Sequence, residues 1–231
     1  MVQVRRLGQK EVVSLLGPPG AGKGTVAQAW RAQEPLASLC TGDLCREHVR
    51  KETRLGKELG RYISVGQLVP DELISAMVAE WLADAIKEEV PVVLDGYPRT
   101  APQVGHLLEM LAEYAPTYTL RVVLFDIPLS VVIDRLLNRI VCPNSACLRV
   151  YSGKLLVGTS VCPACSAPLQ QRSDDERQVI ERRLLGYEQN KTALLKAYAH
   201  AGIAVDVFPV EQVPYTDMFR AFSELMTRRQ K

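Results

Sequence analysis

Short apolar runs rich in β-branched residues alternate along the chain with segments whose apolar residues recur every three or four positions. The apolar runs predict β-strands, and they occupy residues 11–17, 35–40, 91–98, 120–128 and 203–209. The periodic segments predict helices, and they occupy residues 26–33, 71–87, 102–115, 129–139 and 218–230. Two of the runs, 91–98 and 120–128, are continuously apolar, which suits strands buried on both faces.

The alternation of strands and helices also predicts how they are arranged. Repeated β–α units with short connections form a parallel sheet that is covered by helices on both faces. We therefore predict an α/β fold, a three-layer sandwich built on a five-stranded parallel sheet. Ligands of such folds bind at the carboxyl ends of the strands.

The most informative segment is the glycine-rich sequence GPPGAGKGT at residues 17–25, which lies between the first predicted strand and the first predicted helix. Its G-x-x-x-x-G-K spacing is typical of a P-loop, which cradles phosphate oxygens with backbone N–H groups. The helix dipole and the Lys23 ammonium group add positive charge at the same place. Gly24 stands where this motif usually has serine or threonine, and Thr25 offers a hydroxyl one residue later. The expected triphosphate contacts are Gly20, Ala21, Gly22, Lys23, Gly24 and Thr25.

Composition narrows the class of protein. The chain has 231 residues, of which 47% are hydrophobic, and this is enough for one main domain with its own core. The net charge of +2 gives no general affinity for polyanions, so we expect no nucleic-acid partner. No apolar stretch is long enough to span a membrane, and the basic N-terminus lacks the apolar region of a secretory signal. We therefore expect a cytoplasmic protein with reduced thiols.

Four of the six cysteines fall close together in the sequence, as two pairs around a hairpin-like segment at residues 151–158. Cys142 and Cys147 enclose four residues, Cys162 and Cys165 enclose two, and thiolates at such spacings suit tetrahedral Zn²⁺. All three histidines lie elsewhere in the sequence, which favours an all-cysteine site. A closed four-sulfur site is structural and would stiffen a lobe that has almost no core. Unligated thiols or a redox pair are the alternatives.

Four further segments extend the pattern, namely TGDLCR at 41–46, LVPDEL at 68–73, LDGYPRT at 94–100 and RSDDERQVIERRL at 172–184. Together with the glycine-rich loop, and in this order, they resemble the adenylate kinase family in its long-lid, zinc-bearing bacterial form. Each of the four is a weak signal alone, whereas five motifs in register are highly specific.

The resemblance implies a monomeric enzyme that transfers a phosphoryl group reversibly from ATP to AMP, giving two ADP, with Mg²⁺ on the nucleotide. Two lobes would close over the substrates and exclude water. The implied organisation is a core P-loop domain of residues 1–39, 70–137 and 176–231, an AMP-binding lobe of residues 40–69 and a zinc-bearing lid of residues 138–175.

The resemblance implies catalytic and substrate-binding roles for the residues at the family's motif positions. Guanidinium groups suit bidentate contact with phosphates, and phosphoryl transfer needs such charge neutralisation more than covalent chemistry. The implied catalytic residues are Lys23, Arg99, Arg139, Arg172 and Arg183. The implied ATP contacts beyond the P-loop are Arg135, which would stack on adenine, Arg139, Val150 and Tyr151. The implied AMP contacts are Thr41, Arg46, Gln67, Leu68, Val69, Gly96, Arg99, Gln103, Arg172 and Arg183.

The resemblance also implies that Asp95, and with it Asp43, holds Mg²⁺ through water, and that Gln103 reads adenine, because an amide both donates and accepts. The alternatives are solvated surface arginines, helix-capping roles for Thr41 and Asp43, and a merely polar Gln103. Arg172 and Arg183 are eleven residues apart, about three helical turns, so they would face the same way if one helix joined them.

Two other functions stay open at this point. One is a nucleoside monophosphate kinase with another base preference, such as GTP:AMP or UMP/CMP transfer. The second is a non-enzymatic nucleotide-binding protein with a zinc ribbon, although the cysteine-bearing segment has few of the basic and aromatic residues that such a ribbon needs. The sequence DVFPVEQ at residues 206–212 matches the family poorly, so the resemblance assigns no ATP contact to that loop.

Overall fold

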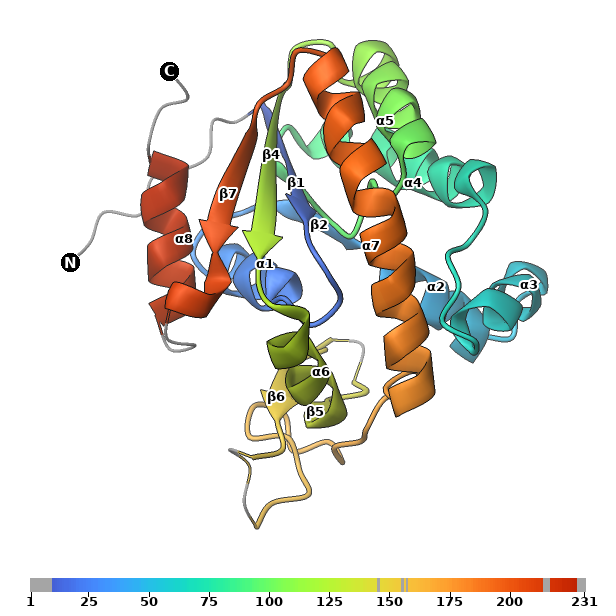
Figure 1. The fold of residues 1–231 in the computed structure, drawn as a ribbon, viewed down its shortest axis with the longest axis vertical. Coiled ribbons are helices and arrows are strands. Elements are labelled where there is room, and N and C mark those ends of the chain that lie inside the picture. The colour runs from blue at the N-terminus through green and yellow to red at the C-terminus, as the bar shows by residue number, and fades with distance from the viewer. Residues whose placement is uncertain (1–9, 145, 155, 157, 214–216, 228–231) are drawn as a thin grey trace.

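The main sheet is parallel throughout, as Figure 1 shows. The computed structural model describes residues 10–144, 146–154, 156, 158–213 and 217–227. Within them the five strands follow the spatial order β2-β3-β1-β4-β7, and all four pairings are parallel. These strands are β1 (Glu11–Leu16), β2 (Ala37–Cys40), β3 (Val92–Asp95), β4 (Thr119–Asp126) and β7 (Val205–Pro209). The predicted α/β fold with a five-stranded parallel sheet is confirmed.

Helices connect the strands and cover both faces of the sheet. They are α1 (Lys23–Arg31), α2 (Thr41–Arg50), α3 (Arg54–Ile63), α4 (Asp71–Ala85), α5 (Ala101–Tyr114), α6 (Leu129–Leu137), α7 (Arg177–His200) and α8 (Met218–Thr227). Two short 3-10 turns, η1 (Ile86–Glu88) and η2 (Val210–Gln212), follow α4 and β7. None of the helices within the described ranges is both long and apolar enough to cross a lipid bilayer.

The two faces of the sheet separate because side chains alternate along each strand. Val13 and Leu15 of β1 belong to one core cluster, which includes residues of α1 and α8. Val12 and Leu16 point the other way, into clusters that include residues of α4, α5 and α7. In Figure 1, α1 and α8 accordingly lie on one side of the strands and α4, α5 and α7 on the other. The result is the predicted three-layer sandwich.

A second, smaller sheet projects beyond the carboxyl ends of the main strands. Strand β5 (Arg139–Val141) pairs in antiparallel fashion with β6 (Val150–Ser152). The loop of this hairpin, residues 142–149, therefore contains the first cysteine pair. It lies before the segment 151–158 that was predicted to form the hairpin. Residues 155 and 157 of that predicted hairpin lie outside the described residues. So do the basic N-terminal stretch before residue 10 and the end of the last predicted helix, at 228–230.

The longest helix, α7, and the two short helices α2 and α3 have no counterpart among the predicted helices. Helix α7 runs for 24 residues, but its buried side chains are sparse along that length. They are Val179, Ile180, Leu184, Leu194 and Tyr198. Because polar residues fill the intervening turns, α7 lacks the dense apolar period by which α1, α4, α5, α6 and α8 were predicted.

Candidate functional site

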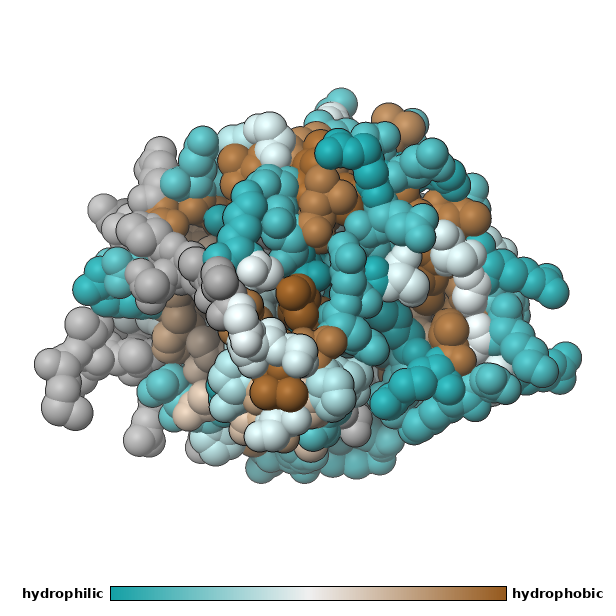
Figure 2. Space-filling model, turned by 90° about the horizontal axis from the view of Figure 1, so that it is seen from below, coloured by the Kyte–Doolittle hydropathy of each residue, from teal (hydrophilic) through white to brown (hydrophobic). Residues whose placement is uncertain are grey.

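One large cavity lies at the carboxyl ends of the strands. It encloses about 1220 Å³ and is lined by the P-loop, by the starts of α2 and α5, by the small second sheet and by α7. Figure 2 shows the molecule from this side, where hydrophilic side chains cover much of the surface and small hydrophobic areas lie between them. The predicted location of the ligand site, beyond the carboxyl ends of the strands, agrees with this position.

The glycine-rich loop turns tightly between β1 and α1 because its glycines adopt backbone angles that side chains disfavour. Gly20 has φ +82° and Gly22 has φ +97°, in the left-handed region where a Cβ is strained. Neighbouring side chains also approach closely. A Cβ at Gly20 would lie 2.9 Å from Leu136 Cγ, and one at Gly22 would lie 2.7 Å from Met218 Sδ. The loop is therefore held in shape by α6 and α8 as well as by its own glycines.

Lys23 is buried at the first turn of α1, with 7% of its surface exposed. Its ammonium group donates to the carbonyl oxygens of Gly17 at 2.9 Å and Pro18 at 2.8 Å. Burial lowers the pKa of Lys23 to about 8, although the nearby Asp95 carboxylate acts in the opposite direction. A buried ammonium group that donates to backbone carbonyl oxygens suits a site that binds a polyanion.

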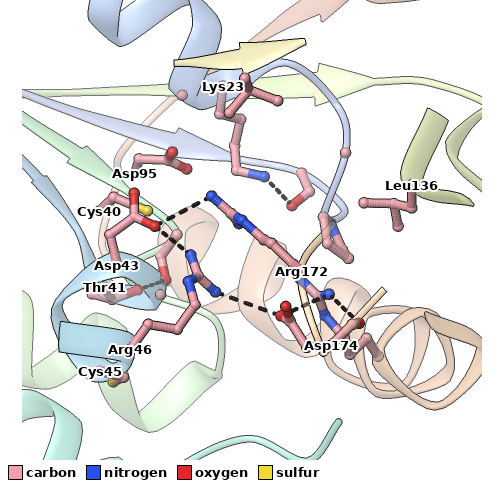
Figure 3. A pocket seen from close by; sticks show the side chains of 18 of the residues that line it. Lys23, Cys40, Thr41, Asp43, Cys45, Arg46, Asp95, Leu136, Arg172 and Asp174 are labelled. Atoms are coloured by element: carbon pink, nitrogen blue, oxygen red, sulfur yellow. Dashed lines mark hydrogen bonds and ion pairs between the residues drawn. The ribbon is translucent and has the colours of Figure 1, made fainter. Parts of the chain in front are cut away.

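Four arginines from separate parts of the chain meet around three carboxylates. Figure 3 shows Arg46 and Arg172 reaching toward each other, with Asp43 beside them and Asp174 at the far side of Arg46. The ion pairs that hold them are Arg46 with Asp43 and Asp174, Arg172 with Asp43, Arg183 with Asp174 and Asp175, and Arg139 with Asp175. We call these seven residues the arginine cluster.

The electrostatics of the arginine cluster favour the binding of an anion. Burial, together with the neighbouring Arg46 and Arg139, lowers the pKa of Arg172 to about 10. Burial likewise lowers the pKa of Arg183 to about 10. Both groups remain cationic at neutral pH, but their charge is incompletely balanced. A phosphate in the cavity would relieve this repulsion.

Two of the acidic members of the cluster, Asp43 and Asp174, have lowered pKa values. Burial opposes ionisation of Asp43, yet Arg46 and Arg172 outweigh it and lower the pKa of that carboxyl group. The same competition, between burial and Arg183 and other arginines, lowers the pKa of Asp174. One oxygen of Asp174, Oδ1, is buried without a hydrogen-bond partner.

The segment after β3 forms another part of the wall. Arg99 Nε donates to the carbonyl of Gly96 at 2.7 Å, and the hydroxyl of Thr41 donates to the same oxygen at 3.0 Å. Gln103 accepts from the backbone N–H of Arg99 at 2.7 Å. Thr41 caps no helix, because its hydroxyl is used in this way and α2 has no side-chain cap. Asp43 likewise lies within the first turn of α2 and pairs with arginines.

Two carboxylates were predicted to hold Mg²⁺ through water, and both line the cavity. Asp95 ends β3, is 8% exposed, and lies beside the P-loop, where a Cβ at Gly24 would come 3.1 Å from its Oδ2. Asp43 is already paired with Arg46 and Arg172. Asp95 is therefore the better placed of the two to face a phosphate-bound cation.

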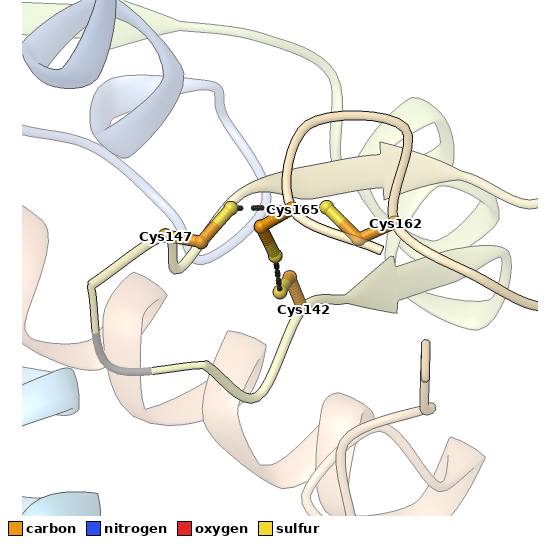
Figure 4. Close-up of side chains that lie close together, drawn as sticks. All are labelled: Cys142, Cys147, Cys162 and Cys165. Carbon is orange, nitrogen blue, oxygen red and sulfur yellow. Dashed lines mark hydrogen bonds between the residues drawn. The ribbon is translucent and has the colours of Figure 1, made fainter. Parts of the chain in front are cut away.

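The predicted metal ligands form a compact cluster. The four sulfur atoms of Cys142, Cys147, Cys162 and Cys165 all lie within 4.8 Å of one another, and they point toward a common centre in Figure 4. The Sγ atoms of Cys142 and Cys165 are 3.4 Å apart, and those of Cys147 and Cys162 are 3.7 Å apart. A tetrahedral ion with metal–sulfur bonds of about 2.3 Å needs similar separations, so the cluster has the geometry of a metal site. The hydroxyl of Tyr151 lies 3.2 Å from Cys162 Sγ.

Most of the predicted nucleotide contacts line the same cavity. They are Gly20, Gly22, Lys23, Gly24, Thr25, Thr41, Arg46, Gln67, Leu68, Val69, Gly96, Arg99, Gln103, Arg135, Arg139, Val150, Tyr151, Arg172 and Arg183. Ala21, within the same loop, does not line the cavity and is fully buried.

One premise about the arginines was wrong. No single helix joins Arg172 to Arg183, because α7 begins only at Arg177. Arg172 lies in the preceding loop and reaches Asp43, whereas Arg183 projects from the helix toward Asp174 and Asp175. Asp174 and Asp175 were not predicted to take part in the site. The sequence RSDDER at residues 172–177, in which both carboxylates closely follow Arg172, was the available signal for their role.

Comparisons with known proteins identify the family. Residues 15–203 match the family described as adenylate kinase. An adenylate kinase of Syntrophomonas wolfei is 37% identical over 204 residues, which cover 84% of this chain and 90% of the relative. An adenylate kinase of Methanococcoides burtonii is 39% identical over 198 residues, covering 84% and 89%. One from Chlamydia trachomatis is 36% identical over 214 residues, covering 86% and 85%. The predicted resemblance is thus confirmed over most of the length, and the chain belongs to the adenylate kinase family.

Proposed function

We propose that this chain is an adenylate kinase, which transfers the terminal phosphoryl group of ATP reversibly to AMP and yields two ADP. The observation that carries the proposal is the convergence of Lys23 and the arginine cluster on one cavity. Transfer between two nucleotides requires two polyanions to meet in line, and the main barrier is their mutual repulsion. Fixed cations around the place where the two nucleotides meet lower that barrier, and no side chain has to form a covalent bond with the phosphoryl group.

On the donor side, the P-loop and Lys23 would hold the triphosphate. Arg139 would reach the transferring group, and Arg135, Val150 and Tyr151 would enclose the adenosine part. In the structure Arg139 is fixed by Asp175 through two hydrogen bonds. A guanidinium that is held in this way keeps its orientation when the substrate arrives.

On the acceptor side, the monophosphate would lie against Arg46, Arg99, Arg172 and Arg183. The base would lie among Thr41, Gly96, Gln103 and the segment Gln67, Leu68 and Val69. Support comes from the placement of all these residues along the same cavity. Helices α2 and α3, which pack against each other, would form the acceptor lobe of residues 40–69, and residues 138–175 would form the lid.

The ions have separate roles in this proposal. Mg²⁺ bound with the nucleotide supplies further positive charge, and Asp95, with Asp43 as the weaker candidate, would hold its waters. Zn²⁺ is the proposed occupant of the cysteine cluster, because four thiolates in this geometry suit a structural tetrahedral site. The monomeric state and the cytoplasmic location stay predictions from the sequence.

The test is a coupled assay of a panel of nucleoside monophosphates, with ATP or GTP as donor. The proposal requires AMP to be the best acceptor and ATP the best donor. A preference for UMP or CMP, or for GTP as donor, would overturn the choice of substrates. Tight nucleotide binding without turnover would favour the non-enzymatic alternative.

A further inference from the structure

The side-chain amide of Gln103 is held at both ends. Its Oε1 accepts from the backbone N–H of Arg99 at 2.7 Å, and its Nε2 donates to Asp71 Oδ1 at 2.6 Å. Gln103 is only 2% exposed, yet it lines the cavity. Asp71, at the start of α4, does not line it. The amide is therefore fixed by one residue that faces the ligand site and one that lies behind it.

The chemistry of the two partners decides which end of the amide is oxygen and which is nitrogen. A backbone N–H can only donate, so it requires Oε1, and a carboxylate can only accept, so it requires Nε2. Rotating the amide by half a turn would set N–H against N–H and oxygen against oxygen. Such a buried arrangement loses both hydrogen bonds and leaves four polar groups unsatisfied. The amide thus has one stable orientation.

A fixed amide distinguishes two classes of purine. A primary amide has two N–H groups and two lone pairs, so at most one of each remains for a ligand here. A 6-aminopurine offers an amino donor beside the N1 acceptor, which matches an amide oxygen beside an amide N–H. A 6-oxopurine offers a carbonyl acceptor beside an N1–H donor, which opposes the same amide at both positions. An unlocked glutamine could rotate and accept either base.

We propose that Asp71 sets the base specificity of the acceptor site by locking Gln103 in the orientation that binds 6-aminopurines and rejects 6-oxopurines. This inference rests on the proposed function, in which Gln103 faces the base of the acceptor monophosphate. Asp71 is a positioning residue, because it acts on the base only through the amide. Its loss changes the ratio between two acceptors rather than the rate of transfer itself.

The test compares AMP with inosine monophosphate (IMP) as acceptors, with ATP as donor. IMP is the suitable probe because its base differs from adenine only along the edge that the amide would read, and it lacks the 2-amino group of guanine. In Asp71→Asn, the new side chain can donate or accept, so one of the two locks is removed. The AMP-to-IMP ratio of kcat/KM should fall about tenfold, the discrimination of one bidentate contact. A purely structural defect would lower both values together and leave the ratio unchanged.

Two matched variants control for charge and for folding. Glu72 is the exposed neighbour of Asp71 in the first turn of α4, so Glu72→Gln removes the same charge there and should keep the wild-type ratio. If Asp71→Asn fails to fold, Asp71→Ser takes its place, because serine also removes the carboxylate that accepts from Gln103, and it should lower the ratio as well.

The outcomes separate the two proposals. A wild-type chain that does not prefer AMP to IMP overturns the proposed acceptor. A wild-type chain that prefers AMP, together with folded Asp71 variants of unchanged ratio, overturns the role of Asp71 alone.

Discussion

Arg172 Nη2 lies 3.3 Å from Asp43 Oδ1, which joins residues separated by 129 positions in the sequence. The same carboxylate also pairs with Arg46. Asp43 therefore stands between two cations that, in the proposed function, would hold a phosphate. In the absence of nucleotide it acts as their internal counterion, and this relationship leads to the first prediction.

Replacing Asp43 with asparagine should leave Arg46 and Arg172 without that counterion. We expect the free energy of unfolding to fall by about 1 kcal/mol, as is usual for a partly exposed ion pair. Pyrophosphate should raise the unfolding temperature of Asp43→Asn more than that of the wild type, because the anion takes over the missing charge. Thermal unfolding at low ionic strength, with and without pyrophosphate, measures both effects. Equal stabilisation of the two proteins would show that Asp43 is no counterion.

Lys23 should give the site a characteristic pH dependence. Its pKa is about 8 in the folded chain and has an ordinary value of 10.5, so the unfolded chain binds more protons between these values. Stability without nucleotide should therefore rise with pH across this window. Bound phosphates favour the charged lysine and raise its pKa, so ATP binding near pH 8.5 should take up a proton. Calorimetry in buffers of different ionisation enthalpy detects that uptake.

The variant Lys23→Met is the control for this titration. It should abolish proton uptake and lower kcat by about 10³-fold, since it removes a fixed charge from the transition state. It should also stabilise the chain without nucleotide by about 1–3 kcal/mol at neutral pH, because a buried ammonium group is replaced by an apolar side chain. Unchanged proton uptake, or near-normal turnover, would contradict the role given to Lys23.

A methyl group at Gly22 should damage the P-loop directly. Gly22 has φ +97°, and its added Cβ would come 2.7 Å from Met218 Sδ. We expect Gly22→Ala to cost about 1–2 kcal/mol of stability from backbone strain and to raise the Kd for ATP. Gly105→Ala is the matched control, because Gly105 lies within α5 and nothing lies within 4 Å of its added Cβ. That change should stabilise the chain by about 0.5–1 kcal/mol and leave ATP binding as it was. Equal effects of the two substitutions would refute the strain argument.

The cysteine cluster predicts a measurable metal content. Protein purified without added metal should contain about one Zn²⁺ per chain, and a chelator should lower its unfolding temperature. Cys147→Ser should lose the metal, whereas Cys45→Ser should keep it, because Cys45 is buried elsewhere in the chain. Elemental analysis and thermal unfolding provide the measurements. A metal-free protein whose stability does not respond to the chelator would leave the thiols unligated.

Much of the fold could be predicted because its signals are local. The buried strands can be recognised as runs of β-branched residues. The P-loop can be recognised by glycines at a fixed spacing before a helix. Helices α2, α3 and α7 were the exceptions, and α7 shows the reason most clearly. Its few buried residues contact a core that is assembled from other segments, so its stability comes from tertiary packing more than from its own pattern.

The sequence by itself determined which chemical groups this protein has for its site: a phosphate-binding loop, a set of arginines and two pairs of cysteines. Only the tertiary structure decided how these groups meet. Arg172 reaches Asp43 from a loop rather than along a helix, and Asp71 fixes Gln103 across 32 positions of chain. The physical reason is that hydrogen bonds and ion pairs act over a few ångströms in space, and spacing along the chain does not fix such distances between separate elements.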